Sequence, residues 1–167
     1  MRAVITAMLM GIACFVHGES FDCETKRPEQ SAFVAIPRFT FTIERAPRPL
    51  EPAAFRVCDA VGAAPFLLVK SSARGKSRVR RIELSEQTHE HLQALYEAAL
   101  SSNFKDDVFG LDGSSWCLEA QRGNNELRAC FWTPQYEAEK RGIDPFRVLG
   151  EALWQMADFG EAYGPLM

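Results

Sequence analysis

The stretch SWCLEAQRGNNELRACFW, from Ser115 to Trp132, decides the fold. It contains two runs in which apolar and polar residues alternate, a pattern typical of paired strands with one buried face. Between the runs lies RGNN, whose glycine and asparagines favour a tight two-residue turn. Two registers are compatible with such a turn. One places Gly123 and Asn124 at the tip, and the other places Asn124 and Asn125 there.

The register with glycine at the tip agrees with both packing and charge. It produces one wholly apolar face, which consists of Trp116, Leu118, Ala120, Leu127, Ala129 and Phe131. On the opposite face it pairs Glu119 with Arg128, and such opposite charges stabilise a sheet modestly. The alternative register separates these two charges. We therefore expect a hairpin with the Gly123–Asn124 tip.

The N-terminus resembles a secretory signal peptide. One base, Arg2, precedes an apolar run, and no acid occurs before Glu19. The run is shorter than the about 20 apolar residues that a membrane-spanning helix needs. We expect residues 1–18 to be removed by cleavage after Gly18, which leaves 19–167 as a single periplasmic or secreted domain.

A lipid anchor is the alternative fate of this leader. Residues 12–14, Ile-Ala-Cys, resemble the end of a bacterial lipoprotein signal, which would place a lipid on Cys14. Gly11 departs from that signal, because a large aliphatic residue is usual there. Either way, loss of Arg2 changes the net charge from −3 to −4. This mild acidity argues against general nucleic-acid binding, which requires a strongly basic face.

Four cysteines follow the leader, and an even number in an oxidising compartment favours two disulfides over buried thiols. The chosen register places Cys117 opposite Cys130 as a non-hydrogen-bonded pair. Their Cα atoms should lie ~4.5 Å apart, at the short end of the range that a disulfide accepts. By elimination Cys23 pairs with Cys58. Closing that loop of about 35 residues could contribute ~3–4 kcal/mol.

Hydrophobic periodicity predicts the remaining elements. Alternating or apolar runs indicate strands at 39–44, 55–59, 65–70 and 78–84. A first helix begins after the capping residue Ser85 and carries an apolar stripe of Leu92, Leu95, Tyr96 and Ala99.

A second helix has Asp144 as its predicted N-cap, Pro145 as its first residue and Gly160 at its end. Its apolar stripe consists of Phe146, Leu149, Leu153, Met156 and Ala157. Residues 134–142 should form a short helical turn that closes at glycine. We expect an α+β fold, with an antiparallel sheet of about five or six strands and two main helices packed on one face.

Two surface features carry candidate functions. A basic patch surrounds the predicted turn at 70–77 and consists of Arg74, Lys76, Arg78, Arg80 and Arg81. It is either a solvated hairpin tip, which we favour, or a contact for an anionic partner. Trp132 lies on the polar face of the hairpin, where it is either covered by residues 134–143 or available to a partner. Aromatic residues and arginines are enriched at binding hot spots, so Arg128 belongs to the same hypothesis.

Catalytic motifs are absent from the sequence. His89 and His91 lie two apart on one helix and point about 200° apart, so they cannot share a metal. The acidic loop 106–113 lacks the ligand spacing of a calcium loop. Asp112 and Glu119 are the candidate carboxylates for an enzyme that acts on envelope polymers. No phosphate loop, dinucleotide fingerprint or zinc spacing is present, so we expect no cofactor.

The hairpin and the helix that follows resemble a loose group of small bacterial proteins. The shared features are Asp-Gly-x-x-Trp-x-x-Glu, here residues 112–119, an aromatic-Thr-Pro step at 132–134, and a closing helix. The resemblance implies a common hairpin-plus-helix unit and transfers no activity. The Cys117–Cys130 pair is not a general feature of the group.

Export, small size, cysteine content and the lack of a catalytic set together favour binding over catalysis. We expect an envelope protein that binds another protein, such as an immunity protein or an inhibitor of a cell-envelope-active enzyme. The alternatives are the carboxylate-dependent enzyme and an accessory component of an envelope machine.

Overall fold

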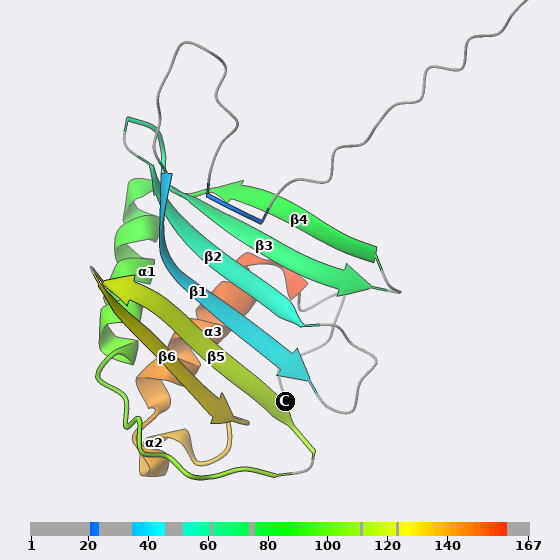
Figure 1. Ribbon diagram of the computed structural model, residues 1–167, viewed down its shortest axis with the longest axis vertical. Helices are drawn as coiled ribbons and strands as arrows, with labels where there is room; N and C mark the ends of the chain where they lie inside the picture. Colours follow the sequence, from blue (N-terminus) through cyan, green and yellow to red (C-terminus); the bar gives the residue numbers. More distant parts are fainter. Residues whose placement is uncertain are drawn as a thin grey trace, which may run out of the picture.

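The computed structural model describes most of the chain after residue 20 (Figure 1). The described residues are 21–23, 35–45, 52–60, 62–73, 76–110, 112–122 and 124–159. The predicted leader with its cleavage site and Cys14 lies outside them, as do Arg74, Gly123 and Gly160.

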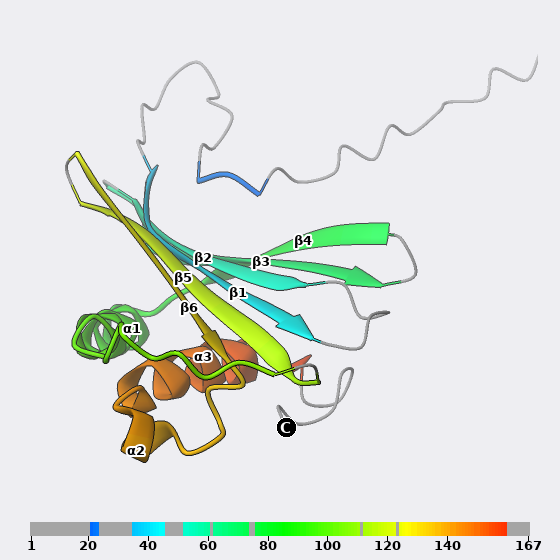
Figure 2. The same cartoon turned by 60° about the horizontal axis from the view of Figure 1, so that its bottom comes forward.

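Six strands and three helices follow one another along the chain. They are β1 (Ala35–Arg45), β2 (Ala53–Ala60), β3 (Phe66–Ala73), β4 (Lys76–Glu83), α1 (Glu86–Ala99), β5 (Ser114–Arg122), β6 (Asn125–Trp132), α2 (Ala138–Arg141) and α3 (Asp144–Met156). The strands form one antiparallel sheet in the order β4-β3-β2-β1-β5-β6. The helices lie on one face of this sheet, and no described helix covers the other, which we call the open face (Figure 2). The predicted α+β architecture is confirmed.

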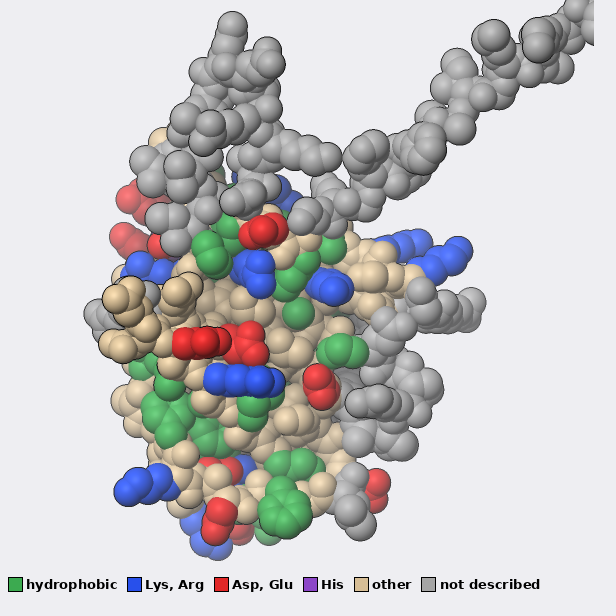
Figure 3. Space-filling model, in the orientation of Figure 1, with side chains coloured by type: hydrophobic (Ala, Val, Ile, Leu, Met, Phe, Trp, Pro, Cys, Tyr) green, Lys and Arg blue, Asp and Glu red, His purple; other side chains and the backbone are tan. Residues whose placement is uncertain are grey.

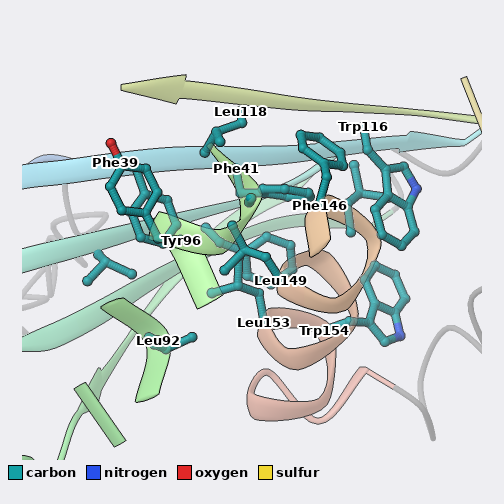
Figure 4. Packing of buried hydrophobic residues seen from close by; sticks show 14 of the residues in the cluster. Phe39, Phe41, Leu92, Tyr96, Trp116, Leu118, Phe146, Leu149, Leu153 and Trp154 are labelled. Atoms are coloured by element: carbon teal, nitrogen blue, oxygen red, sulfur yellow. The ribbon is translucent and has the colours of Figure 1, made fainter. Parts of the chain in front are cut away.

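The main core fills the space between the sheet and the helices. Alternate residues of the strands meet the helical stripes there (Figure 4). Phe39 of β1 stacks on Tyr96 of α1 with ring centroids 4.6 Å apart, and Phe41 meets Trp116 edge-on at 6.0 Å. The close approach of α3 to the sheet requires Gly150, since a Cβ atom there would lie 2.4 Å from the Trp116 ring.

The hairpin has the predicted register. Glu119 lies opposite Arg128, and Cys117 lies opposite Cys130. All six residues of its apolar face are buried except Leu127, which is partly buried. The alternation of apolar and polar residues within the hairpin therefore predicted both that β5 pairs with β6 and which face packs against the helices.

Both predicted disulfides are present. Cys117 and Cys130 are bonded with Cα atoms 4.1 Å apart, close to the separation expected for a non-hydrogen-bonded pair. Cys23 and Cys58 form the second bond, with a Cα separation of 5.7 Å. The pairing by elimination is confirmed.

The Cys23–Cys58 bond belongs to a second, smaller core on the open face of the sheet. It packs with Phe66 and Leu68, and Phe21 and Val79 are partly buried against it. Arg56 also contacts this segment. Its Nη1 donates to the Phe21 carbonyl at 2.8 Å, and its guanidinium lies 4.7 Å from the centre of the Phe21 ring. Residues 21–23 are thus tied to β2 by a covalent bond and a cation.

The helix starts differ from the prediction at one place. Ser85 caps α1 as predicted, because its hydroxyl accepts from the Thr88 N–H at 3.1 Å. For α3, however, the cap is Ile143, and Asp144 is already the first helical residue. The Asp144 carboxylate accepts from Arg147 instead of from a backbone N–H.

Charged side chains reinforce the first turns of α3, which ends at Met156. Arg147 donates to both Glu151 and Asp144. These hydrogen bonds, of which the one to Glu151 has the larger effect, raise the pKa of the Arg147 guanidinium above its ordinary value.

None of the described helices has both the length and the apolar character needed to cross a lipid bilayer.

Candidate functional site

The most exposed large apolar side chains lie on two neighbouring segments. Within the described residues, Phe104, Phe109 and Tyr136 leave 43%, 87% and 55% of their surface exposed. The first two belong to the loop 101–110 after α1, and Tyr136 belongs to the turn after β6. In Figure 1 this loop passes below the ends of β5 and β6, beside α2. We call these three residues, together with Trp132, the aromatic surface.

A buried ion pair holds the two segments together. Arg141 of α2 donates to Asp106 of the loop through Nε at 3.1 Å and through Nη2 at 2.6 Å. Both side chains are only 5% exposed. Such a planar, two-point contact fixes orientation as well as distance.

Arg141 also binds the turn that follows β6. Its Nη1 donates to the carbonyls of Thr133 and Tyr136 at 3.0 and 2.8 Å, and its Nη2 donates to the carbonyl of Trp132 at 2.9 Å. All five guanidinium N–H groups therefore have acceptors. One side chain thus fixes the loop, the turn and α2 relative to each other.

Trp132 is half-buried, but the segment that covers it is not the predicted one. A Cβ atom on Gly110 would lie 2.4 Å from Cζ2 of Trp132, and one on Gly113 would lie 3.0 Å from the same ring. The backbone of the loop before β5 is therefore in close contact with the indole. Residues 134–143 contact Trp132 through the bond from Arg141 to its carbonyl. The remaining surface of the indole is open to solvent.

The turn between β6 and α2 is conformationally costly. Thr133 and Glu137 have φ values of 39° and 47°, and they are two of the three described non-glycine residues with positive φ. A left-handed conformation is especially unusual for a β-branched residue such as Thr133. The amide atoms of Gln135 are buried without a hydrogen-bond partner. Strain of this kind concentrates at functional sites and persists only where surrounding contacts enforce it.

The other predicted site residues on the hairpin and just before it are Glu119, Arg128 and Asp112. Glu119 bonds to Arg128 at 3.2 Å, as predicted, and both side chains are exposed on the open face. Figure 3 shows that acidic and basic side chains are neighbours on this face. Asp112 is exposed and precedes β5, whereas Glu119 is five residues beyond Ser114, about 16 Å along an extended strand. This strand segment alone is longer than the about 5–10 Å between paired glycosidase carboxylates, which argues against a catalytic pair.

The basic residues of β4 are divided between the two faces of the sheet. Arg81 lies over the ring of Phe66 on the open face, 3.7 Å from its centre. Arg80 donates to the carbonyl of Ala157 at the end of α3, on the helical face. A cation at that place stabilises the negative end of the helix. Lys76 and Arg78 are exposed and share the face of Arg80, because side chains two residues apart on a strand point the same way.

His89 has a partner that the sequence did not reveal. Its Nε2 lies 2.8 Å from Oδ1 of Asp59, and the side chain is 21% exposed. His91, two residues further along the helix, is exposed. No group of three or more His, Cys, Asp or Glu side chains suited to a metal occurs in the part of the chain that the structure describes.

No protein-family model matches this chain, and the comparisons with curated proteins and with solved structures found no significant match. The candidate site therefore depends on its own geometry. Its central residues, Arg141 and Asp106, were missed by the sequence analysis. They lie 35 residues apart.

Proposed function

We propose that this protein is an exported domain that binds another protein through the aromatic surface. The observation that carries the proposal is the combination of exposed aromatic side chains with a loop and a turn fixed by a buried arginine. Large aromatic side chains contribute disproportionately to binding energy at protein interfaces. A surface held in one conformation loses less entropy when the partner binds.

The exposed aromatic side chain and the strained turn lower the stability of the free domain, which supports a binding role over a merely structural one. Phe109 is 87% exposed and contributes almost nothing to the core of the free protein. The turn beside it contains strained residues and a buried unpaired amide. These features are unfavourable for the isolated domain, and contact with a partner would compensate for them.

The proposed partner is a protein of the cell envelope. Two disulfides are compatible with an extracytoplasmic location, where thiols oxidise. An immunity protein, or an inhibitor of an enzyme that acts on the envelope, would need a rigid surface and no catalytic group of its own. The separation of Asp112 from Glu119 weakens the alternative of a carboxylate-dependent enzyme.

Site-specific photo-cross-linking in the producing cell tests this proposal. A photoreactive phenylalanine analogue replaces Phe109 in one variant and Gln87, in the first turn of α1, in a matched control, and both positions are exposed. We expect a discrete covalent adduct from position 109 that position 87 does not give. The adduct should disappear when Tyr136→Ala is added to the position-109 variant.

Three results would contradict the proposal. They are equal cross-linking from both positions, no adduct from position 109 across growth conditions, and an adduct that Tyr136→Ala leaves unchanged. Thermal melting of each variant confirms that it is folded, since neither Phe109 nor Tyr136 belongs to the core.

A further inference from the structure

A second site lies at the opposite end of the hairpin, where β5 and β1 separate. Their pairing ends at Phe39 and Ala120. Beyond this point the tip of the β5–β6 hairpin diverges from the beginning of β1 (Figures 1 and 2). Two hollows of about 290 and 550 Å³ adjoin the point of separation, and both are lined by Arg38 and Gln121.

Arg38 projects into both hollows because β1 has a bulge there. Pro37 pairs with Cys58 and Phe39 pairs with Val57, so Arg38 is the extra residue. A bulge redirects a side chain and often occurs beside a functional site. The larger hollow is bounded by Arg38 and Gln121, by Tyr96 and Glu97 of α1, and by Leu100 and Ser101 directly after this helix.

The described residues do not saturate the guanidinium of Arg38. Its one ion pair among them joins Nη1 to Oδ2 of Asp59 at 3.4 Å. This is longer than the about 2.7–2.9 Å of a strong charge-assisted bond. Asp59 has a closer partner, because its other oxygen lies 2.8 Å from His89. The Arg38 side chain is 40% exposed, and its other N–H groups have no acceptor in the part of the chain that the structure describes.

The other side chains around the larger hollow are suited to an apolar body. Tyr96 is 8% exposed and stacks on Phe39 with an interplanar angle of 5°, which gives a flat aromatic floor. Leu100, directly after α1, extends this apolar surface. Glu97 accepts a hydrogen bond from Gln93 on its own helix, which restrains it there. An apolar floor with few polar groups at its rim is typical of small-ligand sites.

From this geometry we propose that the larger hollow binds a carboxylate attached to an apolar group. The carboxylate accepts from these other N–H groups of Arg38, and the apolar group packs on Tyr96 and Leu100. The C-terminal residue of a peptide and a free N-acylated amino acid share this chemistry. The site is separate from the aromatic surface, so it does not depend on the proposed protein partner.

Titration of the ¹⁵N-labelled, disulfide-bonded protein with N-acetyl-leucine tests the inference. We expect shifts of the amide signals of Phe39, Tyr96 and Gln121. N-acetyl-leucinamide, which lacks the negative charge, should bind at least about tenfold more weakly, as expected for the loss of a charge-assisted hydrogen bond. A hexapeptide that ends in leucine, with a free or an amidated C-terminus, distinguishes the two sources. Tighter binding of the free-acid hexapeptide than of N-acetyl-leucine identifies a peptide ligand, and equal binding identifies the small acid.

Variants of Arg38 make the test specific. Arg38→Gln should remove the preference for the carboxylate, whereas Arg128→Gln, outside both hollows, should leave it unchanged. Arg38→Lys retains the charge without the planar fork and should bind with intermediate affinity. Unchanged chemical shifts elsewhere verify that each variant is folded.

The inference is overturned if millimolar N-acetyl-leucine shifts no amide, or if the acid and the amide bind equally. It is also overturned if Arg38→Gln binds like the unmodified protein. None of these results bears on the cross-linking at position 109, so the two proposals can fail independently.

Discussion

Replacing Arg141 with methionine should be among the most destabilising single changes outside the main core. The substitution preserves most of the side-chain volume and removes the charge with all five N–H donors. It leaves the carboxylate of Asp106 buried without its counter-ion. It also removes the donor to three carbonyl groups in the turn after β6. Breaking a buried pair by deleting one partner typically costs about 3–5 kcal/mol.

Urea denaturation of the oxidised protein, followed by tryptophan fluorescence, measures this loss. With a slope of about 2 kcal/mol per molar urea, the midpoint should fall by about 2 M. Lys140→Met is the matched control, because the neighbouring Lys140 is exposed and its ion pair with Glu137 lies on the surface. An exposed pair of this kind contributes about 0–1 kcal/mol, so the midpoint should hardly change.

Hydrogen exchange identifies the region that loosens. The Asn103 N–H donates to the carbonyl of Gly142 at 2.9 Å, and the Arg141 N–H donates to Glu137 at 3.0 Å. Both amides should lose protection in Arg141→Met, while those of the sheet should retain it below the global transition.

A double-mutant cycle separates the ion pair from the carbonyl contacts. Asp106→Leu removes the stranded charge, so the double variant should be less destabilised than the sum of the single changes, by about 0.5–3 kcal/mol. If Arg141→Met costs less than about 1 kcal/mol, or if the two changes are additive, the buried pair does not hold the loop as the geometry implies.

Three further predictions concern a close packing contact, a left-handed residue and the exposure of the two disulfides. Gly150→Ala should destabilise by about 1–3 kcal/mol in thermal or urea unfolding, because the new methyl group meets the Trp116 ring, and the better helix propensity of alanine offsets at most about 1 kcal/mol. Glu137→Gly should raise the free energy of unfolding by about 1 kcal/mol through relief of its left-handed backbone, whereas Glu139→Gly, within α2, should lower it. Mild reductant followed by alkylation and mass spectrometry should modify the hairpin disulfide before the buried disulfide of residues 21–23, and the reverse order would contradict their observed exposure.

The hairpin shows what a sequence can specify. Its register followed from alternation, charge and cysteine spacing, which all depend on neighbours across one tight turn. The Glu119–Arg128 contact was predicted for the same reason. The second disulfide required no geometry, because only Cys23 and Cys58 remained after the first pair was assigned.

The two candidate sites depend on tertiary contacts that no local sequence pattern predicts. Arg141 and Asp106 are 35 residues apart, and the short helix and the loop that bring them together are set by tertiary packing. Asp106 was visible in the sequence only as part of an acidic loop. Similarly, the alternation around Phe39 predicts a regular strand, whereas β1 has a bulge at Arg38. A bulge adds one residue without a characteristic sequence pattern, so the direction of Arg38 could not be predicted.

The position of the strain indicates what the turn after β6 is built for. Glycine at residues 133 and 137 would adopt positive φ at little cost, yet the chain has threonine and glutamate there. Five hydrogen bonds from Arg141 hold the neighbouring carbonyl groups and the loop in place against this strain. A turn optimised for stability alone would need neither the strain nor a buried charge, since apolar residues often replace such a pair without loss. The arrangement instead fixes the backbone that carries Phe109, Trp132 and Tyr136, and a defined position of exposed aromatic side chains is useful mainly for recognition.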